Sequence, residues 1–189
     1  MRVRFAISRR RLKLSRASVR RFEPWCLAFK ARILAKKGQK VETIKLAGRG
    51  VEISRETGIT FCGPLALGIF AFLCGDADKR HTAFEEAQAV LARGCVSHNY
   101  FWFYRDAMEA SLNAGEWADA ERFANALEAY TRAEPVPWSN FYISWSRALA
   151  DWGRGNRDGE EELRRLLALA REKQLGLAVP AIERALAEA

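Results

Sequence analysis

Two pairs of polar side chains have the types and spacing needed to bind a peptide. Asn99 and Asn140 occupy equivalent starts of two predicted helices, and Arg105 and Arg147 follow them within about two helical turns. A side-chain amide can both donate hydrogen bonds to peptide groups and accept them, and a guanidinium can donate two parallel hydrogen bonds to a carboxylate. We therefore predict partner binding by these four residues, with a protein or peptide as the partner. In the alternative interpretation, the asparagines cap helices and the arginines pair with neighbouring carboxylates such as Asp106.

The other reactive side chains do not form a catalytic or metal-binding pattern. His81 and His98 are the two histidines, and Cys95 with His98 forms one CxxH without the two further ligands that zinc needs. Neither a P-loop nor a GxSxG string occurs, and Gly48-Arg49-Gly50 lies in a predicted helix, where close helix packing explains it. We expect no enzyme activity, no cofactor and no metal.

The positive charge of the chain is concentrated at its start. The formal net charge is +8, and residues 1–22 contain basic side chains but no acidic one. The rest of the chain, residues 23–189, is close to neutral. The basic arm is interpreted as a flexible tail, a targeting peptide or the product of a wrongly chosen start codon. Alternatively, it contacts nucleic-acid phosphates through Arg9, Arg10, Arg11 and Lys13.

Apolar runs and cysteines indicate a cytoplasmic protein. The longest apolar run, from Pro64 to Cys74, is too short to cross a bilayer and predicts a buried helix. Charges recur through the first residues, which argues against a secretory signal. Cys26, Cys62, Cys74 and Cys95 form no CxxC pair, so we expect buried, reduced thiols.

An internal repeat is the most informative pattern. Four glycines recur at nearly constant spacing: Gly38, Gly75, Gly115 and Gly155. Apolar or small residues follow each glycine at offsets of about 8, 12 and 15, which places them on one helical face. Each unit therefore predicts a helix, a turn at a glycine in the left-handed region, and a second helix.

This frame predicts an all-helical chain. The expected helices are 24–37, 40–56, 63–74, 78–93, 98–113, 116–131, 138–153, 158–173 and 179–188. Five consecutive aromatic residues at 100–104 cover more than one helical turn, which favours packing inside an array over ligand stacking.

Two resemblances add a family expectation. The segment GEWADAERFANAL, residues 115–127, resembles the second helix of a tetratricopeptide repeat. Roughly residues 56–188 resemble the C-terminal helical-repeat region of bacterial multidomain adenylate or guanylate cyclase homologues, where the repeats follow an ATPase module. That resemblance is found in GITFCGP (58–64), GCVSHNYFWFYRD (94–106) and EPVPWSNFYISWSRALADWGRG (134–155). It implies a sensing or protein-interaction part without catalysis of its own.

The sequence thus predicts a tetratricopeptide-like α-α solenoid of about four helix pairs plus a C-terminal helix, formed by residues 23–189. We expect a non-catalytic interaction or scaffold module, the repeat portion of a larger signalling ATPase or cyclase-type protein. The first helix has no preceding helix to cover its apolar side, which predicts self-association there. A nucleic-acid-binding protein that uses the basic arm is the alternative.

Overall fold

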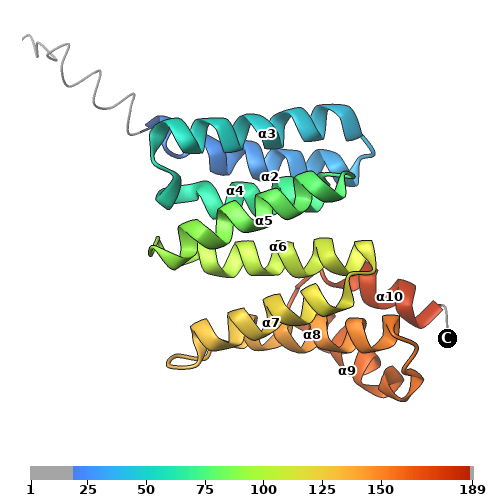
Figure 1. Cartoon of the computed structure of the whole chain (residues 1–189). Coiled ribbons are helices and arrows are strands. Elements are labelled where there is room, and N and C mark those ends of the chain that lie inside the picture. Colours follow the sequence, from blue (N-terminus) through green and yellow to red (C-terminus); the bar gives the residue numbers. More distant parts are fainter. Residues whose placement is uncertain (1–18, 188–189) are drawn as a thin grey trace, which may run out of the picture. The chain divides into compact units, whose positions relative to one another are not determined.

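The computed structural model describes residues 19–187. The candidate nucleic-acid residues Arg9, Arg10, Arg11 and Lys13 lie outside this range. Every regular element within it is a helix, which confirms the all-α prediction (Figure 1). The helices are α2 (Glu23–Lys36), α3 (Lys40–Thr57), α4 (Ile59–Leu73), α5 (Ala77–Ala92), α6 (His98–Ala114), α7 (Trp117–Thr131), α8 (Pro137–Gly153), a short 3-10 turn η1 (Arg157–Gly159), α9 (Glu160–Glu172) and α10 (Val179–Ala187).

The chain divides into two compact units, and the boundary falls between Asn99 and Tyr100 in the first turn of α6. In the N-terminal unit, α4 is the central helix and packs against α2, α3 and α5. Its residues Leu65 and Ile69 are fully buried, as the apolar run in the sequence predicts. The helices α3 and α5 both pack on α4, but within the described part of this unit their backbones do not pack closely on each other.

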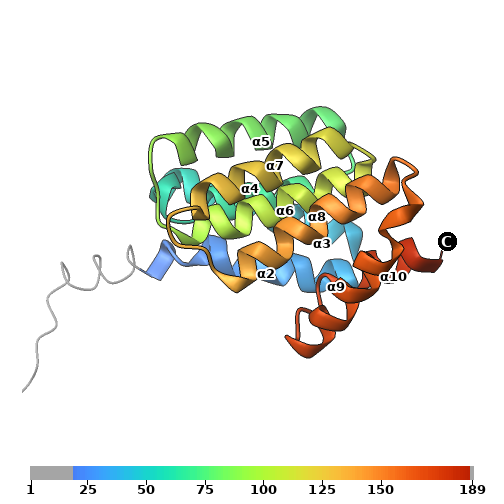
Figure 2. The same ribbon diagram turned by 90° about the horizontal axis from the view of Figure 1, so that it is seen from below.

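The C-terminal unit is organised around α8, which packs against α7, α9 and α10 (Figure 2). The side chain of Trp145 on α8 is buried, and its indole N–H donates to the carbonyl of Ala178 at 3.3 Å. Phe123 of α7 and Leu163 of α9 are also fully buried. The apolar stripes that follow the repeated glycines therefore form the core of this unit.

The glycine turns agree with the prediction at three of four positions. These three glycines have positive φ angles: Gly38 (77°), Gly115 (74°) and Gly155 (95°). The prediction is wrong for Gly75, which is not among the glycines with positive φ. There the connection is made differently, because Cys74 is extended and the side chain of Asp76 caps α5 by accepting from the N–H of Lys79.

The cysteine prediction is only partly correct. All four cysteines are free thiols, but Cys62 alone is buried, Cys26 is exposed, and Cys74 and Cys95 are half-buried. Burial raises the pKa of the Cys62 thiol to about 11, because an apolar environment disfavours the thiolate. None of the described helices is long and apolar enough to span a membrane.

Candidate partner-binding groove

The four predicted partner-binding residues differ sharply in exposure. Asn99 is 0% exposed and Arg105 is 1% exposed, whereas Asn140 is exposed and Arg147 is partly exposed. A partner at the surface can therefore reach the side chains of Asn140 and Arg147 without any rearrangement. The burial of Asn99 and Arg105 fits the alternative interpretation, in which these residues stabilise the fold.

Asn99 completes the hydrogen bonds that Pro64 interrupts inside α4. Proline has no N–H and displaces the preceding turn, so backbone groups near it lose their helical partners. The Oδ1 atom of Asn99 accepts from the N–H of Leu65 at 3.2 Å. Its amide nitrogen donates to the carbonyls of Thr60 at 3.3 Å and Phe61 at 3.0 Å. One side chain thus replaces the missing helical bonds on both sides of the proline.

Arg105 and Asp106 form a buried ion pair in α6. The guanidinium of Arg105 also lies over the ring of Trp102, 4.8 Å from its centroid. Nearby, the ring of Tyr100 stacks on that of Tyr130 at 3.9 Å. The aromatic run at 100–104 therefore takes part in packing within this unit, as its length along the helix suggests.

Arg147 makes surface interactions with α7. Its guanidinium donates to both carboxylate oxygens of Glu128, at 3.2 and 2.7 Å, and to the Oδ1 atom of Asn125 at 2.6 Å. The hydrogen bond from Arg147 lowers the pKa of Glu128, because it favours the ionised carboxylate. This pair is exposed and contributes little to stability.

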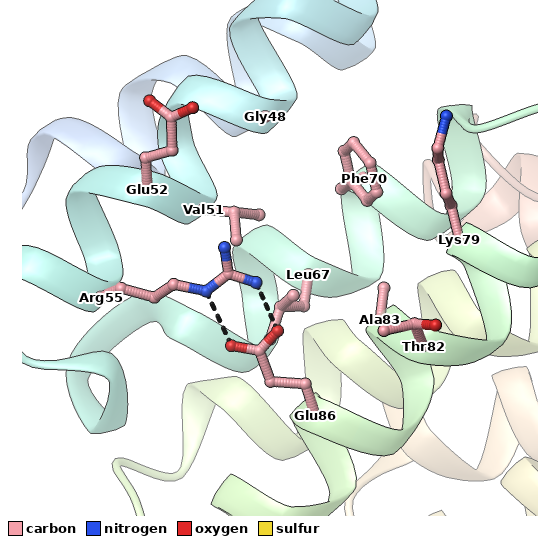
Figure 3. Close-up of a pocket in the computed structure, with 10 residues that line it drawn as sticks. All are labelled: Gly48, Val51, Glu52, Arg55, Leu67, Phe70, Lys79, Thr82, Ala83 and Glu86. Carbon is pink, nitrogen blue, oxygen red and sulfur yellow. Dashed lines mark hydrogen bonds and ion pairs between the residues drawn. The ribbon is translucent and has the colours of Figure 1, made fainter.

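The N-terminal unit has a hollow that the sequence patterns do not predict. It lies between α3 and α5, has a volume of about 340 Å³ and is floored by Leu67 and Phe70 of α4 (Figure 3). Val51 of α3 and Ala83 of α5 add apolar walls. This hollow exists because α3 and α5 both pack on α4, while in the described structure their backbones stay apart and long side chains join them.

The apolar surface continues beyond the hollow along α3. Val41 and Ile44 are 72% and 40% exposed, and they share a helical face with Gly48 and Val51. Together with the hollow, these two side chains form a continuous apolar surface, and contiguous apolar surface is a feature of binding sites. We name the hollow together with Val41 and Ile44 the α3–α5 groove.

One end of the α3–α5 groove is closed by an ion pair. The guanidinium of Arg55 donates to Oε1 of Glu86 at 2.8 Å and to Oε2 at 2.5 Å, a bidentate contact across the hollow (Figure 3). The hydrogen bond to Glu86 raises the pKa of Arg55, so the guanidinium stays charged. Lys79 lies at the opposite end of the hollow, on the other side of Phe70 from Gly48 (Figure 3), and its ammonium also pairs with Asp76 at 3.4 Å. The groove is therefore apolar along its floor and charged at both ends.

Gly48 keeps the α3–α5 groove open. A Cβ atom at this position would meet only the ring of Phe70, at 3.9 Å, which is ordinary van der Waals contact. At Gly50 a Cβ would lie 3.3 Å from the carbonyl oxygen of Pro24 in α2. The packing explanation for these two glycines is therefore confirmed at Gly50, whereas Gly48 borders open space.

We expect opposite effects from alanine at these two glycines. Gly48→Ala should stabilise the protein by about 0.5–1 kcal/mol, because alanine has less backbone freedom to lose in a helix. Gly50→Ala should destabilise it, because the new methyl group crowds backbone that cannot easily move. Urea denaturation followed by circular dichroism compares the two variants. Equal shifts of both midpoints would contradict the difference in their surroundings.

The comparisons with known proteins supply no relative from which a function could be transferred. No family model, no curated protein and no solved structure matches the chain. Function is therefore inferred from the α3–α5 groove and from the surface residues around it.

Proposed function

We propose that this protein is a non-catalytic protein-interaction module and that the α3–α5 groove binds an amphipathic helix of a protein partner. The observation that supports this is the apolar surface from Val41 to Val51, which is open to solvent at one end and deepens over Phe70. Amphipathic helices bind in such grooves by inserting apolar residues at intervals of three, four and seven positions.

The length of the surface fits a helix better than a single side chain. From Val41 to Glu52, α3 advances about 16 Å, at about 1.5 Å per residue. Three turns of a partner helix cover that distance and present three apolar anchors. The hollow itself accepts the largest anchor, and the exposed side chains of Val41 and Ile44 contact the next ones.

The charges predict the direction of the partner helix. Lys79 lies at the end of the hollow away from the Arg55–Glu86 pair, where it makes an exposed 3.4 Å ion pair with Asp76, and Lys45 is exposed one turn before Gly48 on α3. Acidic residues at one end of the partner helix would pair with these two lysines. The Arg55–Glu86 pair closes the other end and already satisfies its own charges. We therefore propose a partner helix with an apolar face and one acidic end.

The proposal also covers the arrangement of the helix pairs and the type of protein to which they belong. Helix pairs joined by glycine turns support a tetratricopeptide-like arrangement, in which successive pairs stack. The sequence resemblance supports a role as the repeat portion of a larger signalling ATPase or cyclase-type protein. Self-association through the first helix is a competing use of the apolar surface, because Phe22 and Ile33 are also exposed.

A display selection tests the groove with a defined probe. We would select helical peptides from a displayed library on the full chain and compare the winners on the Gly48→Leu variant. A leucine side chain at position 48 extends into the hollow beside Phe70, so selected peptides should bind this variant about tenfold or more weakly. They should contain apolar residues at three- and four-residue spacing and acidic residues at one end.

The Gly48→Ala variant is the matched control, because its methyl group leaves most of the hollow open. It should bind the selected peptides nearly as well as the unmodified chain. Peptides that bind the Gly48→Leu and Gly48→Ala variants equally would refute the groove as the binding site. Sedimentation of the unmodified chain tests self-association. A dimer that Gly48→Leu dissociates would assign the α3–α5 groove to a second copy, whereas a dimer that only Ile33→Glu dissociates would use the exposed side of α2 and leave the groove free for a partner.

A further inference from the structure

The C-terminal unit contains a second cavity, which has aromatic walls and a polar edge. It has a volume of about 240 Å³ and lies between the end of α6, the start of α7, the end of α8, and α10. Trp117, Leu149 and Trp152 provide apolar walls, and Asn113 and Arg184 provide the polar edge. The cavity is smaller than typical sites for drug-sized ligands, so a fitting ligand has about one ring.

One wall of this cavity is shaped by a glycine. A Cβ atom at Gly153 would lie 2.6 Å from ring atoms of Trp117, which is closer than any real contact. The indole of Trp117 can therefore lie across α8 only because position 153 has no side chain. The aromatic wall is a specific packing arrangement between α7 and α8.

The polar edge offers a cation that has no carboxylate partner among residues 19–187. Arg184 is exposed, and its one hydrogen bond among the described residues is a long contact of 3.5 Å to Oδ1 of Asn113. Other arginines of this unit pair closely with carboxylates, as Arg165 does with Glu162 at 2.7 Å and Arg171 with Glu183 at 2.8 Å. The guanidinium beside the cavity is thus available for an anionic ligand.

One wall residue, Trp152, also has a polar atom without an acceptor. Trp152 is 4% exposed, and its indole nitrogen has no hydrogen-bond acceptor in the described structure. A buried donor without an acceptor is uncommon and suggests a missing partner. The indole nitrogen of Trp152 is itself covered by protein atoms, so the donors that a ligand in the cavity can reach are those of Arg184 and Asn113, while the walls are aromatic and aliphatic.

We propose that this cavity binds a small organic acid, a carboxylate attached to one aromatic ring or a branched apolar group. The carboxylate would accept from Arg184 and Asn113, and the apolar group would lie against Trp117 and Leu149. A cationic ligand does not fit, because the described side chains lining the cavity include no carboxylate. The site lies in the other unit from the α3–α5 groove and does not depend on it.

Benzoate is the probe for a direct test. We would titrate sodium benzoate into the full ¹⁵N-labelled chain and follow the indole N–H signals, with Trp152→Phe used to assign the Trp152 signal. The signals of Trp117 and Trp152 should shift in a saturable way. Benzamide has the same ring without the charge and should bind about tenfold more weakly.

Two variants identify the residue that recognises the charge. Arg184→Gln should weaken benzoate binding by about tenfold, whereas Arg165→Gln on the surface of α9 should leave it unchanged. The absence of saturable shifts, or equal binding of benzoate and benzamide, would overturn the proposal. A tripeptide Gly-Gly-Phe with a free C-terminus is the third arm. Tighter binding of this peptide than of benzoate would also overturn it, because the ligand would then be a peptide terminus.

Discussion

Replacement of Asn99 by alanine is expected to lower the free energy of unfolding by about 2–4 kcal/mol, because each buried polar group that loses its partner costs about 1–3 kcal/mol. The N–H of Leu65 would lose its acceptor, and the carbonyls of Thr60 and Phe61 would lose a donor. Urea denaturation of the full chain, followed by far-ultraviolet circular dichroism, measures the loss.

A matched control and a coupled variant make this result specific. Asn140→Ala removes an exposed amide and should change stability by less than about 0.5 kcal/mol. Pro64→Ala restores a backbone N–H to α4, so Asn99→Ala should cost less in that background. An Asn99→Ala variant with unchanged stability would show that the three bonds do not stabilise α4.

Removal of Asp106 alone is expected to lower the free energy of unfolding by a similar amount, through a contact in the C-terminal unit. Asp106→Leu leaves the guanidinium of Arg105 buried without its counter-ion, and such single removals cost about 3–5 kcal/mol. Replacing both members, as Arg105→Met with Asp106→Leu, removes the charge as well and should recover most of that loss. The midpoint of thermal unfolding compares the single and double variants.

The exposed pair of Arg147 and Glu128 is the control for the buried one. Glu128→Ala should cost at most about 1 kcal/mol, because both partners remain solvated when separated. A double variant at positions 105 and 106 that is as unstable as Asp106→Leu would contradict the role of the unpaired buried charge. The volume and the aromatic contacts of Arg105 would then matter more than its charge.

The sequence predicts the helices well because local signals determine them. Glycines and the apolar period place most helix ends within two residues of those observed. The exception is α4, which begins at Ile59 and not at residue 63. Pro64 suits a helix start, but it lies in the helix interior. The residue that permits this is Asn99, which is distant in sequence, so no local pattern could identify it.

The candidate sites are harder to predict, because they depend on which helices fail to touch. The α3–α5 groove exists because the backbones of two described helices stay apart and the Arg55–Glu86 pair joins them, and a periodic pattern describes only the faces that pack. A signal is nevertheless present: Gly48 interrupts an otherwise apolar face that includes Val41, Ile44 and Val51. Similarly, Asn99 and Arg105 stand out in the sequence, although polarity alone does not distinguish a buried role from an exposed one.

The bond between α4 and Asn99 also has a consequence for the order of folding. The N–H of Leu65 and the carbonyls of Thr60 and Phe61 do not gain their Asn99 partner until a segment more than thirty positions later in the chain has arrived. During synthesis, α2 and α3 can pair by local contacts, but the first turns of α4 should stay frayed until Asn99 has been made. The contact between Asn99 and the start of α4 therefore forms late in the folding of this unit. A nascent chain stopped before residue 99 should expose α4 to proteases and chaperones.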